Sequence, residues 1–246
     1  VIAFYLGTEA GSMAAVSSDP LLLNWEKIPG CPVIPWQESG KHGSPERPGD
    51  PCLWREEDGY YALTGGYEDG EIFEQGQLAE FLFHSEDLTQ WNYLGQFIED
   101  DRYTAPGEDG AVPYFWPIGD AYILLFASHQ RGSQYFLGDY DQKRHRFKPF
   151  AHGRFNFNQL RRGGVHAPTA TPDGEGGILV IHNINWGKPA EVGEWDHIMS
   201  LPRRLTLADD RTLRIQPVDA LTKLRGDHQH LGETRLPANE TVVLDG

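Results

Sequence analysis

Two groups of carboxylates stand directly ahead of short apolar runs that contain a proline. Asp50 opens the run Asp-Pro-Cys-Leu-Trp at residues 50–54, and Glu108 and Asp109 precede a second run at residues 112–116. Hydrolysis of a glycosidic bond needs two carboxyl groups, one to protonate the leaving oxygen and one to attack or to activate water. The pattern therefore indicates a glycosidase-type site. The competing interpretations are an Asx-turn for Asp50 and a solvated loop carboxylate for Glu108.

Two further residues on such runs could bind a sugar. Trp54 could stack on a sugar ring, although packing in the core is the commoner role of a tryptophan in a strand. His166 opens a third proline-containing run, at residues 166–169, and could hydrogen-bond a hydroxyl group. The ten histidines show no His-Glu-x-x-His or other close metal spacing. No cofactor or metal is therefore indicated.

The segments that would position these residues read as short strands. Apolar runs rich in aromatic and branched residues alternate with 28 glycines and 17 prolines, and no helix of three or more turns is indicated. One type of strand recurs at residues 1–7, 59–66, 120–128 and 177–187, at a spacing of about 60 residues. This spacing suits the four-stranded blades of a β-propeller with long loops.

A second element follows the first two copies of the recurring strand. Residues 17–20 lead to Trp25 and residues 85–88 lead to Trp91, so a polar turn precedes a tryptophan that can pack between blades. Chance similarity among the hairpins of a β-sandwich is the alternative, but the repeated order favours an all-β propeller. Each proline-containing run would be the innermost strand of its blade, with its leading end at the mouth of the channel. The first copy has no such run before it.

The composition is acidic. The 246 residues carry 21 Lys and Arg against 36 Asp and Glu, a formal net charge of −15. This balance argues against a nucleic-acid partner, which needs a basic face, and against an anionic membrane surface. An acidic chain with many tryptophans suits a neutral ligand rich in hydroxyl groups, because carboxylates accept hydrogen bonds from hydroxyls and aromatic faces pack on sugar rings.

Several segments together resemble glycoside hydrolase family 32, the group of invertases, levanases and inulinases. The run at residues 50–54, followed by Asp-Gly-Tyr-Tyr at residues 58–61, resembles the family's Arg-Asp-Pro segment. Residues 108–126 resemble its Glu-Cys-Pro-Asp segment and the strand after it. Later segments match in the same order, at residues 138–141, 167–169 and 201–207.

The resemblance implies a fold and an activity. It spans residues 1 to about 220, for which it implies a five-bladed β-propeller that lacks the first blade or more. Residues 221–246 would be a linker or the start of a C-terminal β-sandwich. The implied activity is retaining hydrolysis of β-fructosides, either sucrose or fructans, with a carbohydrate as substrate and without a cofactor or metal.

The resemblance also implies roles for individual residues. Asp50 would hold sugar hydroxyls and stabilise the oxocarbenium-like transition state, and Glu108 would be the general acid/base. The chain departs from the family pattern here, because extra residues separate Glu108 from the proline of the next run, so Asp109 could be the acid instead. Gly49 stands where the family has an arginine, and Arg47 is a weak substitute for it.

The family's nucleophile has no counterpart in these 246 residues. It is an Asp in an Asn-Asp-Pro-Asn-Gly motif on the inner strand of the first blade. We therefore expect this chain alone to be poorly active on sucrose and fructans. Two alternatives to an active hydrolase stay open. One is a non-catalytic carbohydrate-binding propeller, and the other is a truncated fragment whose open blade edge pairs with a copy of itself or a second chain.

Overall fold

The protein is built almost entirely of antiparallel β-sheets. The computed structural model describes residues 1–41, 43–68, 75–156, 164–185, 197–228, 230 and 232–243. Within these ranges the helical element is a short 3-10 helix, η3 (Asp219–Leu224). None of the helices described there is long and apolar enough to cross a membrane.

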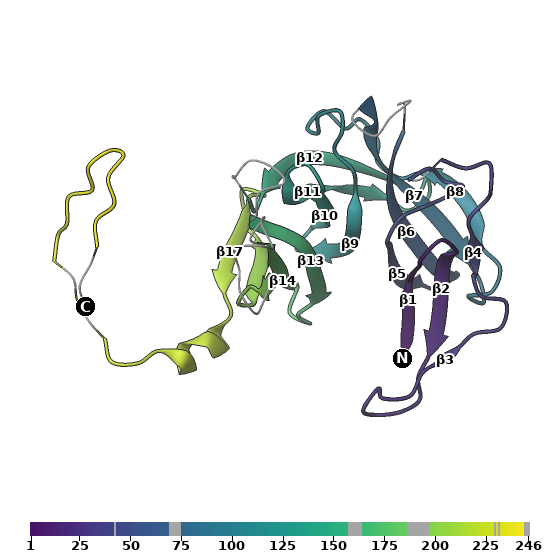
Figure 1. Cartoon of the computed structure of the whole chain (residues 1–246), viewed down its shortest axis with the longest axis horizontal. Helices are drawn as coiled ribbons and strands as arrows, with labels where there is room; N and C mark the ends of the chain where they lie inside the picture. Colours follow the sequence, from purple (N-terminus) through teal and green to yellow (C-terminus); the bar gives the residue numbers. More distant parts are fainter. Residues whose placement is uncertain are drawn as a thin grey trace.

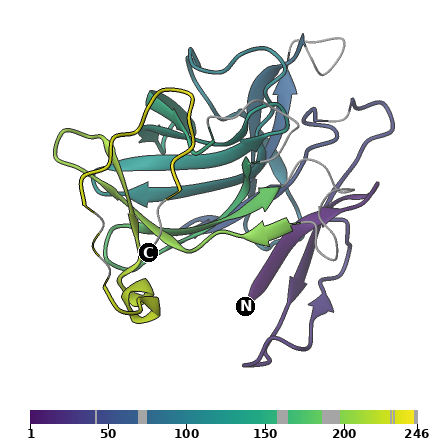
Figure 2. The ribbon, with the colours of Figure 1, turned by 60° about the vertical axis from the view of Figure 1, so that its left-hand side comes forward.

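Four sheets follow one another along the chain as the blades of a propeller, from the purple N-terminal sheet to the green fourth sheet in Figures 1 and 2. Blade 1 contains β1 (Ile2–Gly7), β2 (Gly11–Val16), β3 (Glu26–Lys27) and β4 (Ile34–Pro35). Blade 2 contains β5 (Pro51–Glu56), β6 (Gly59–Glu68), β7 (Gln77–Ser85) and β8 (Asn92–Gln96). Blade 3 contains β9 (Ala111–Ile118), β10 (Ala121–Ser128), β11 (Gly132–Asp141) and β12 (Arg146–Arg154). Blade 4 contains β13 (Gly164–Pro172), β14 (Ile178–Asn185), β15 (His197–Met199), β16 (Arg203–Leu207) and β17 (Leu213–Pro217).

The order of the strands confirms the predicted propeller. Blades 2 and 3 run in simple order from their first strand to their fourth, and blade 4 runs β13-β14-β16-β17. The strand β9 contacts both β5 and β13, so the first strands of these three blades are the innermost ones. All three correspond to the proline-containing runs of the sequence. In blade 1 the strand β1 pairs with β2, as β6 pairs with β7, and no other strand of the described chain pairs with β1.

Blades 1 and 2 each contain a polar turn that leads to a tryptophan, and the two turns have the same hydrogen bond. The indole Nε1 of Trp25 donates to the carbonyl of Leu22 at 2.8 Å. The indole Nε1 of Trp91 donates to the carbonyl of Leu88 at 2.9 Å. Both leucines have a positive φ, 55° and 72° respectively. The internal repeat predicted from the sequence is therefore present in the backbone geometry.

Aromatic side chains fill the space between blades. The largest core cluster lies where blades 2 and 3 meet and includes Leu63, Phe97, Phe115, Phe126 and Phe147. Burying each such side chain contributes about 1.5–3 kcal/mol. Between blades 1 and 2, the rings of Phe4 and Trp91 lie 5.0 Å apart. Because these clusters fix each blade against the next, the leading ends of the inner strands are held close together.

The chain leaves the propeller after β17. Residues 225–228 and most of the residues described after them are exposed and contain no strand. In Figure 1 this segment extends away from the sheets. Residues 229, 231 and 244–246, which belong to the predicted linker, lie outside the described residues.

Candidate functional site

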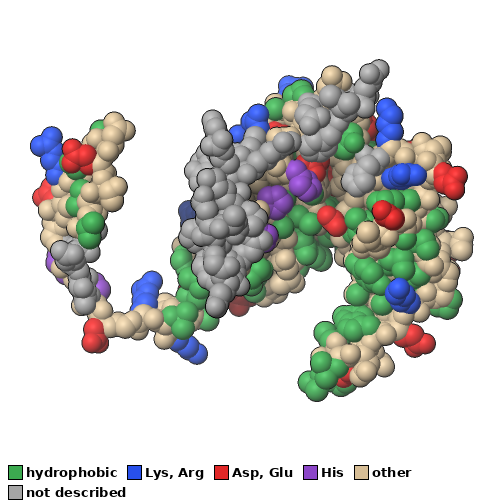
Figure 3. Space-filling view, viewed as in Figure 1, with side chains coloured by type: hydrophobic (Ala, Val, Ile, Leu, Met, Phe, Trp, Pro, Cys, Tyr) green, Lys and Arg blue, Asp and Glu red, His purple; other side chains and the backbone are tan. Residues whose placement is uncertain are grey.

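Two of the predicted carboxylates line one hollow at the leading ends of β5 and β9. Asp50 directly precedes β5, and Asp109 stands two residues before β9. The hollow has a volume of about 490 Å³, within the range of roughly 300–1,000 Å³ typical of small-molecule sites. Its other lining residues are Leu6, Gly43, Gly49, Gly65, Gly66, Tyr67, Ala111 and His129. Figure 3 shows histidine and carboxylate side chains close to one another near the middle of the face in view.

Two glycines of β6, Gly65 and Gly66, line the hollow with backbone atoms alone, and loops from other parts of the chain pack directly on them. A Cβ atom added to Gly65 would collide with the carbonyl oxygen of Gly110. One added to Gly66 would collide with the carbonyl oxygen of Gly43. Only glycine lets the backbone approach so closely. These glycines bring the loop that carries Asp109 directly onto blade 2.

The start of β9 is irregular. Val112 has a φ of 47°, which is strained for a β-branched residue and costs on the order of 1–3 kcal/mol. The pairing of β9 with β10 shifts register here, so that Val112 and Pro113 together lie opposite Phe126. Proline lacks an N–H group and fits such a bulge. Bulges beside a site turn side chains in new directions, and this one lies just after the residues that line the hollow.

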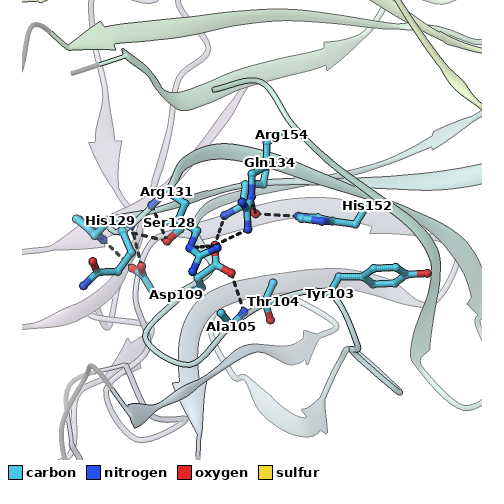
Figure 4. A network of polar contacts seen from close by, with 12 residues as sticks. Tyr103, Thr104, Ala105, Asp109, Ser128, His129, Arg131, Gln134, His152 and Arg154 are labelled. Carbon is cyan, nitrogen blue, oxygen red and sulfur yellow. Dashed lines mark hydrogen bonds and ion pairs between the residues drawn. The ribbon is translucent and has the colours of Figure 1, made fainter. Parts of the chain in front are cut away.

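Glu108 is buried in the protein and is not among the residues that line the hollow. Its side chain is 1% exposed. Its Oε2 accepts a hydrogen bond from the backbone N–H of Ala105 at 2.7 Å, and its Oε1 accepts one from Gln134 Nε2 at 2.8 Å. Arg131 and Arg154 lie 3.6 and 3.7 Å from the same Oε1 (Figure 4). Glu108 therefore ties the loop before β9 to β11 and β12.

The orientation of this network follows from Glu108. A carboxylate can only accept, so the Gln134 amide must turn its Nε2 toward Glu108 and its Oε1 the other way. Gln134 Oε1 then accepts from His152 Nε2 at 2.8 Å, which places the ring proton of His152 on Nε2. Burial lowers the pKa of His152, and the neighbouring Arg154 lowers it further. His152 is thus a neutral member of a structural network.

Asp109 is held at the hollow by His129. Its Oδ1 accepts from the backbone N–H of His129 at 2.9 Å, and its Oδ2 lies 2.7 Å from His129 Nδ1. The His129 side chain is 65% exposed, whereas that of Asp109 is 11% exposed. The hydrogen bond to Asp109 raises the pKa of His129 above its usual value. His166, at the start of β13, is not among the residues that line the hollow, but its ring lies 5.8 Å from that of His129.

Two other predicted sugar-binding residues lie elsewhere. Trp54 stacks on Tyr61, with ring centroids 5.6 Å apart, and joins the aromatic core between blades 2 and 3. The Arg47 guanidinium donates to the backbone carbonyls of Gln37 and Glu38 at 2.7 and 2.8 Å, so it stabilises its own loop. Neither residue is among those that line the hollow.

Sequence reasoning missed His129 and Tyr67 as lining residues. His129 follows β10 and stands 20 residues after Asp109, and antiparallel pairing of β9 with β10 brings the two together. His129 could have been predicted from its place directly after the second strand of its blade. In an antiparallel pair the second strand ends where the first strand starts, which is at the mouth of the channel. Tyr67 occupies the corresponding end of β6.

Four sheets arranged as blades, with two carboxylates at the leading ends of adjacent inner strands, define the class of the protein: a β-propeller with a hollow lined by carboxylates. The model of the glycosyl hydrolases family 32 N-terminal domain matches residues 5–217. The chain belongs to glycosyl hydrolase family 32, as the sequence resemblance indicated.

Individual relatives agree with this family. The chain is 27% identical over 208 residues to sucrose-6-phosphate hydrolase of Bacillus subtilis, covering 74% of this chain and 40% of that protein. It is 28% identical over 232 residues to fructan 1-exohydrolase of Leymus chinensis, covering 85% and 37%. Its fold matches the Bombyx mori GH32 beta-fructofuranosidase with a TM-score of 0.71 at 21% identity, over 93% of this chain and 50% of that one. The chain thus spans half or less of the length of these relatives.

Proposed function

We propose that the whole protein is a retaining glycoside hydrolase that acts on β-fructosides, either sucrose or fructans. The observation that carries the proposal is that Asp50 and Asp109, from two adjacent inner strands, line the same hollow. The names of the relatives support the substrate class, since they include a sucrose-6-phosphate hydrolase and a fructan 1-exohydrolase. A variant of the Bombyx mori enzyme is also described in complex with sucrose.

Asp109 is the general acid/base in this proposal, and Asp50 stabilises the oxocarbenium-like transition state. The sequence favoured Glu108 for the first role, but Glu108 is buried among four groups that donate to it or carry positive charge. Asp109 lines the hollow, and His129, which also lines it, holds the carboxylate through its backbone N–H and its ring Nδ1. A general acid must lie within hydrogen-bond reach of the atom that it protonates, which favours Asp109.

A retaining mechanism also needs a nucleophile, about 5–5.5 Å from the acid/base. Among the residues that the structure describes, Asp50 and Asp109 are the carboxylates that line the hollow. Because both already have roles, the proposal assigns the nucleophile to a carboxylate outside the residues that the structure describes. It also assigns sugar binding to His166, through a hydrogen bond to a hydroxyl group.

The proposal extends to domains and partners. Residues 1–220 form a partial catalytic propeller, and residues 221–246 form a linker or the start of a β-sandwich. Leu21 and Leu23, in the loop between β2 and β3 of blade 1, are 75% and 76% exposed. These exposed apolar side chains favour a partner that covers blade 1, either a further segment of the protein, a copy of the chain or a second chain.

The test is an assay of the full-length gene product on sucrose, sucrose 6-phosphate and inulin, with NMR to follow the anomeric configuration of the released sugar. We expect hydrolysis with retention of configuration. Sucrose binding without release of fructose would support the non-catalytic binding propeller instead. Neither binding nor release would contradict both functions. The variant Asp120→Asn removes an exposed carboxylate that does not line the hollow, so it should hydrolyse the same substrates as the wild type.

A further inference from the structure

A fully buried carboxyl group, that of Glu80, lies behind the floor of the hollow. Glu80 belongs to β7, where its backbone pairs with Gly65 of β6, and its exposed fraction is 0%. A Cβ atom added to Gly110 would collide with Glu80 Oε1, so this oxygen packs directly on the Gly110 backbone. Gly110 follows Asp109, and Gly65 lines the hollow. Glu80 therefore stands on the protein side of the wall that presents Asp109.

The surroundings of Glu80 favour its protonated form. Neither of its carboxyl oxygens has a hydrogen-bond partner among the residues that the structure describes. An ionised carboxylate without partners is costly in such a place, and the group takes up a proton instead. Burial raises the pKa of Glu80 well above its usual value, and the negative charge of Asp109 raises it further. Among the described residues, Cys52 of β5 is a further titratable neighbour, a buried thiol whose pKa is raised to about 12.

We propose that Glu80 is a positioning residue of this site, a neutral carboxylic acid that is coupled to Asp109 across the Gly110 backbone. The proposal rests on the role proposed above for Asp109. While Glu80 is protonated, it adds no charge behind Asp109, whose carboxylate is held by His129. When Glu80 loses its proton, two carboxylates face each other across one glycine. Their repulsion then acts on the loop that presents Asp109. This repulsion sets the upper pH limit of activity at the site.

The direct test follows the glutamate carboxyl carbons by ¹³C NMR as the pH of the full-length protein is raised. We expect one glutamate to titrate well above the others, and its signal to be absent from Glu80→Gln but present in the exposed control Glu86→Gln. Asp109→Asn should lower the midpoint of this signal by on the order of one pH unit, whereas Asp120→Asn should not. A Glu80 midpoint in the ordinary range, or one that Asp109→Asn leaves unchanged, would overturn the proposal.

The Asp109→Asn arm keeps the test decisive even where Glu80→Gln fails to fold, because it leaves Glu80 in place. A second measurement addresses the consequence for the reaction. In Glu80→Gln the alkaline limb of the kcat/KM profile on sucrose should move up by about one pH unit or disappear, with Glu86→Gln like the wild type. An unchanged limb would overturn the positioning role. Absence of hydrolysis in the wild type would count against the proposed function, and the NMR titration would still decide whether Glu80 and Asp109 are coupled.

Discussion

Two adjacent carboxylates have opposite surroundings. Glu108 enters the protein and receives hydrogen bonds from Ala105 and Gln134, whereas Asp109 reaches the hollow and is held by His129. Both residues stand in the loop before β9, where Glu108 closes a turn with a hydrogen bond from its backbone N–H to the carbonyl of Ala105. At the scale of residues, a single position therefore separates a group that shapes the loop from one that can meet a substrate.

Replacing Glu108 by Gln should lower stability and reduce sugar binding and turnover together. Every close neighbour of the carboxylate is a hydrogen-bond donor or a guanidinium, so the new NH₂ group would face a donor. We expect a loss of about 1–3 kcal/mol in the free energy of unfolding. Urea unfolding measures this, with Glu86→Gln as the exposed control. Unchanged stability combined with a selective loss of turnover would return the acid role to Glu108.

His129 should make stability depend on pH. Its hydrogen bond to Asp109 raises its folded-state pKa above the unfolded value. The stabilisation by this pair is therefore fully present below the unfolded pKa, about 6.5, and is lost as the pH rises through the folded pKa. The unfolding free energies of wild type and His129→Gln should differ more at pH 5.5 than at pH 9. An equal difference at the two pH values would show that the ion pair contributes nothing.

At the scale of elements, the sequence predicted the inner strands but not their geometry at the mouth. The proline-containing runs mark β5, β9 and β13 because proline fits the first residue of a strand or a bulge. The positive φ of Val112 could not be predicted, since valine disfavours that conformation and only the surrounding structure imposes it. The site of Glu80 also escaped, because alternation along β7 predicts a face of the sheet and not what packs on it.

The glycines of blade 2 give a prediction at the same scale. Gly65→Ala should destabilise the protein and reduce binding at the hollow, because the added Cβ would collide with the Gly110 carbonyl and push the Asp109 loop away. A cost of about 1–3 kcal/mol is expected for such overpacking. Gly226→Ala is the matched control, since nothing lies within 4 Å of the added Cβ there. Equal thermal midpoints for the two variants would contradict the close crossing of loop and strand.

At the scale of the whole molecule, three blades bring the residues of the proposed site close together. Asp50 comes from blade 2, Asp109 and His129 from blade 3, and His166 from blade 4. The −15 net charge suits an uncharged substrate rich in hydroxyl groups. The chain is only 27% and 28% identical to the two relatives named above. The family could still be predicted from the sequence, because several short segments follow one another in the family's order. Residues that meet only through blade packing, such as His129 and Asp109, needed the structure.

The most direct test of the central claim is the kinetics of Asp109→Asn in the full-length protein, measured with sucrose. The amide keeps the shape of the side chain but cannot deliver a proton, so kcat should fall roughly 10²–10⁴-fold while sucrose binding stays nearly unchanged. Asp50→Asn should weaken both binding and turnover, and Asp120→Asn should change neither. A wild-type kcat for Asp109→Asn would contradict the claim that this carboxylate performs the acid/base chemistry of the hollow.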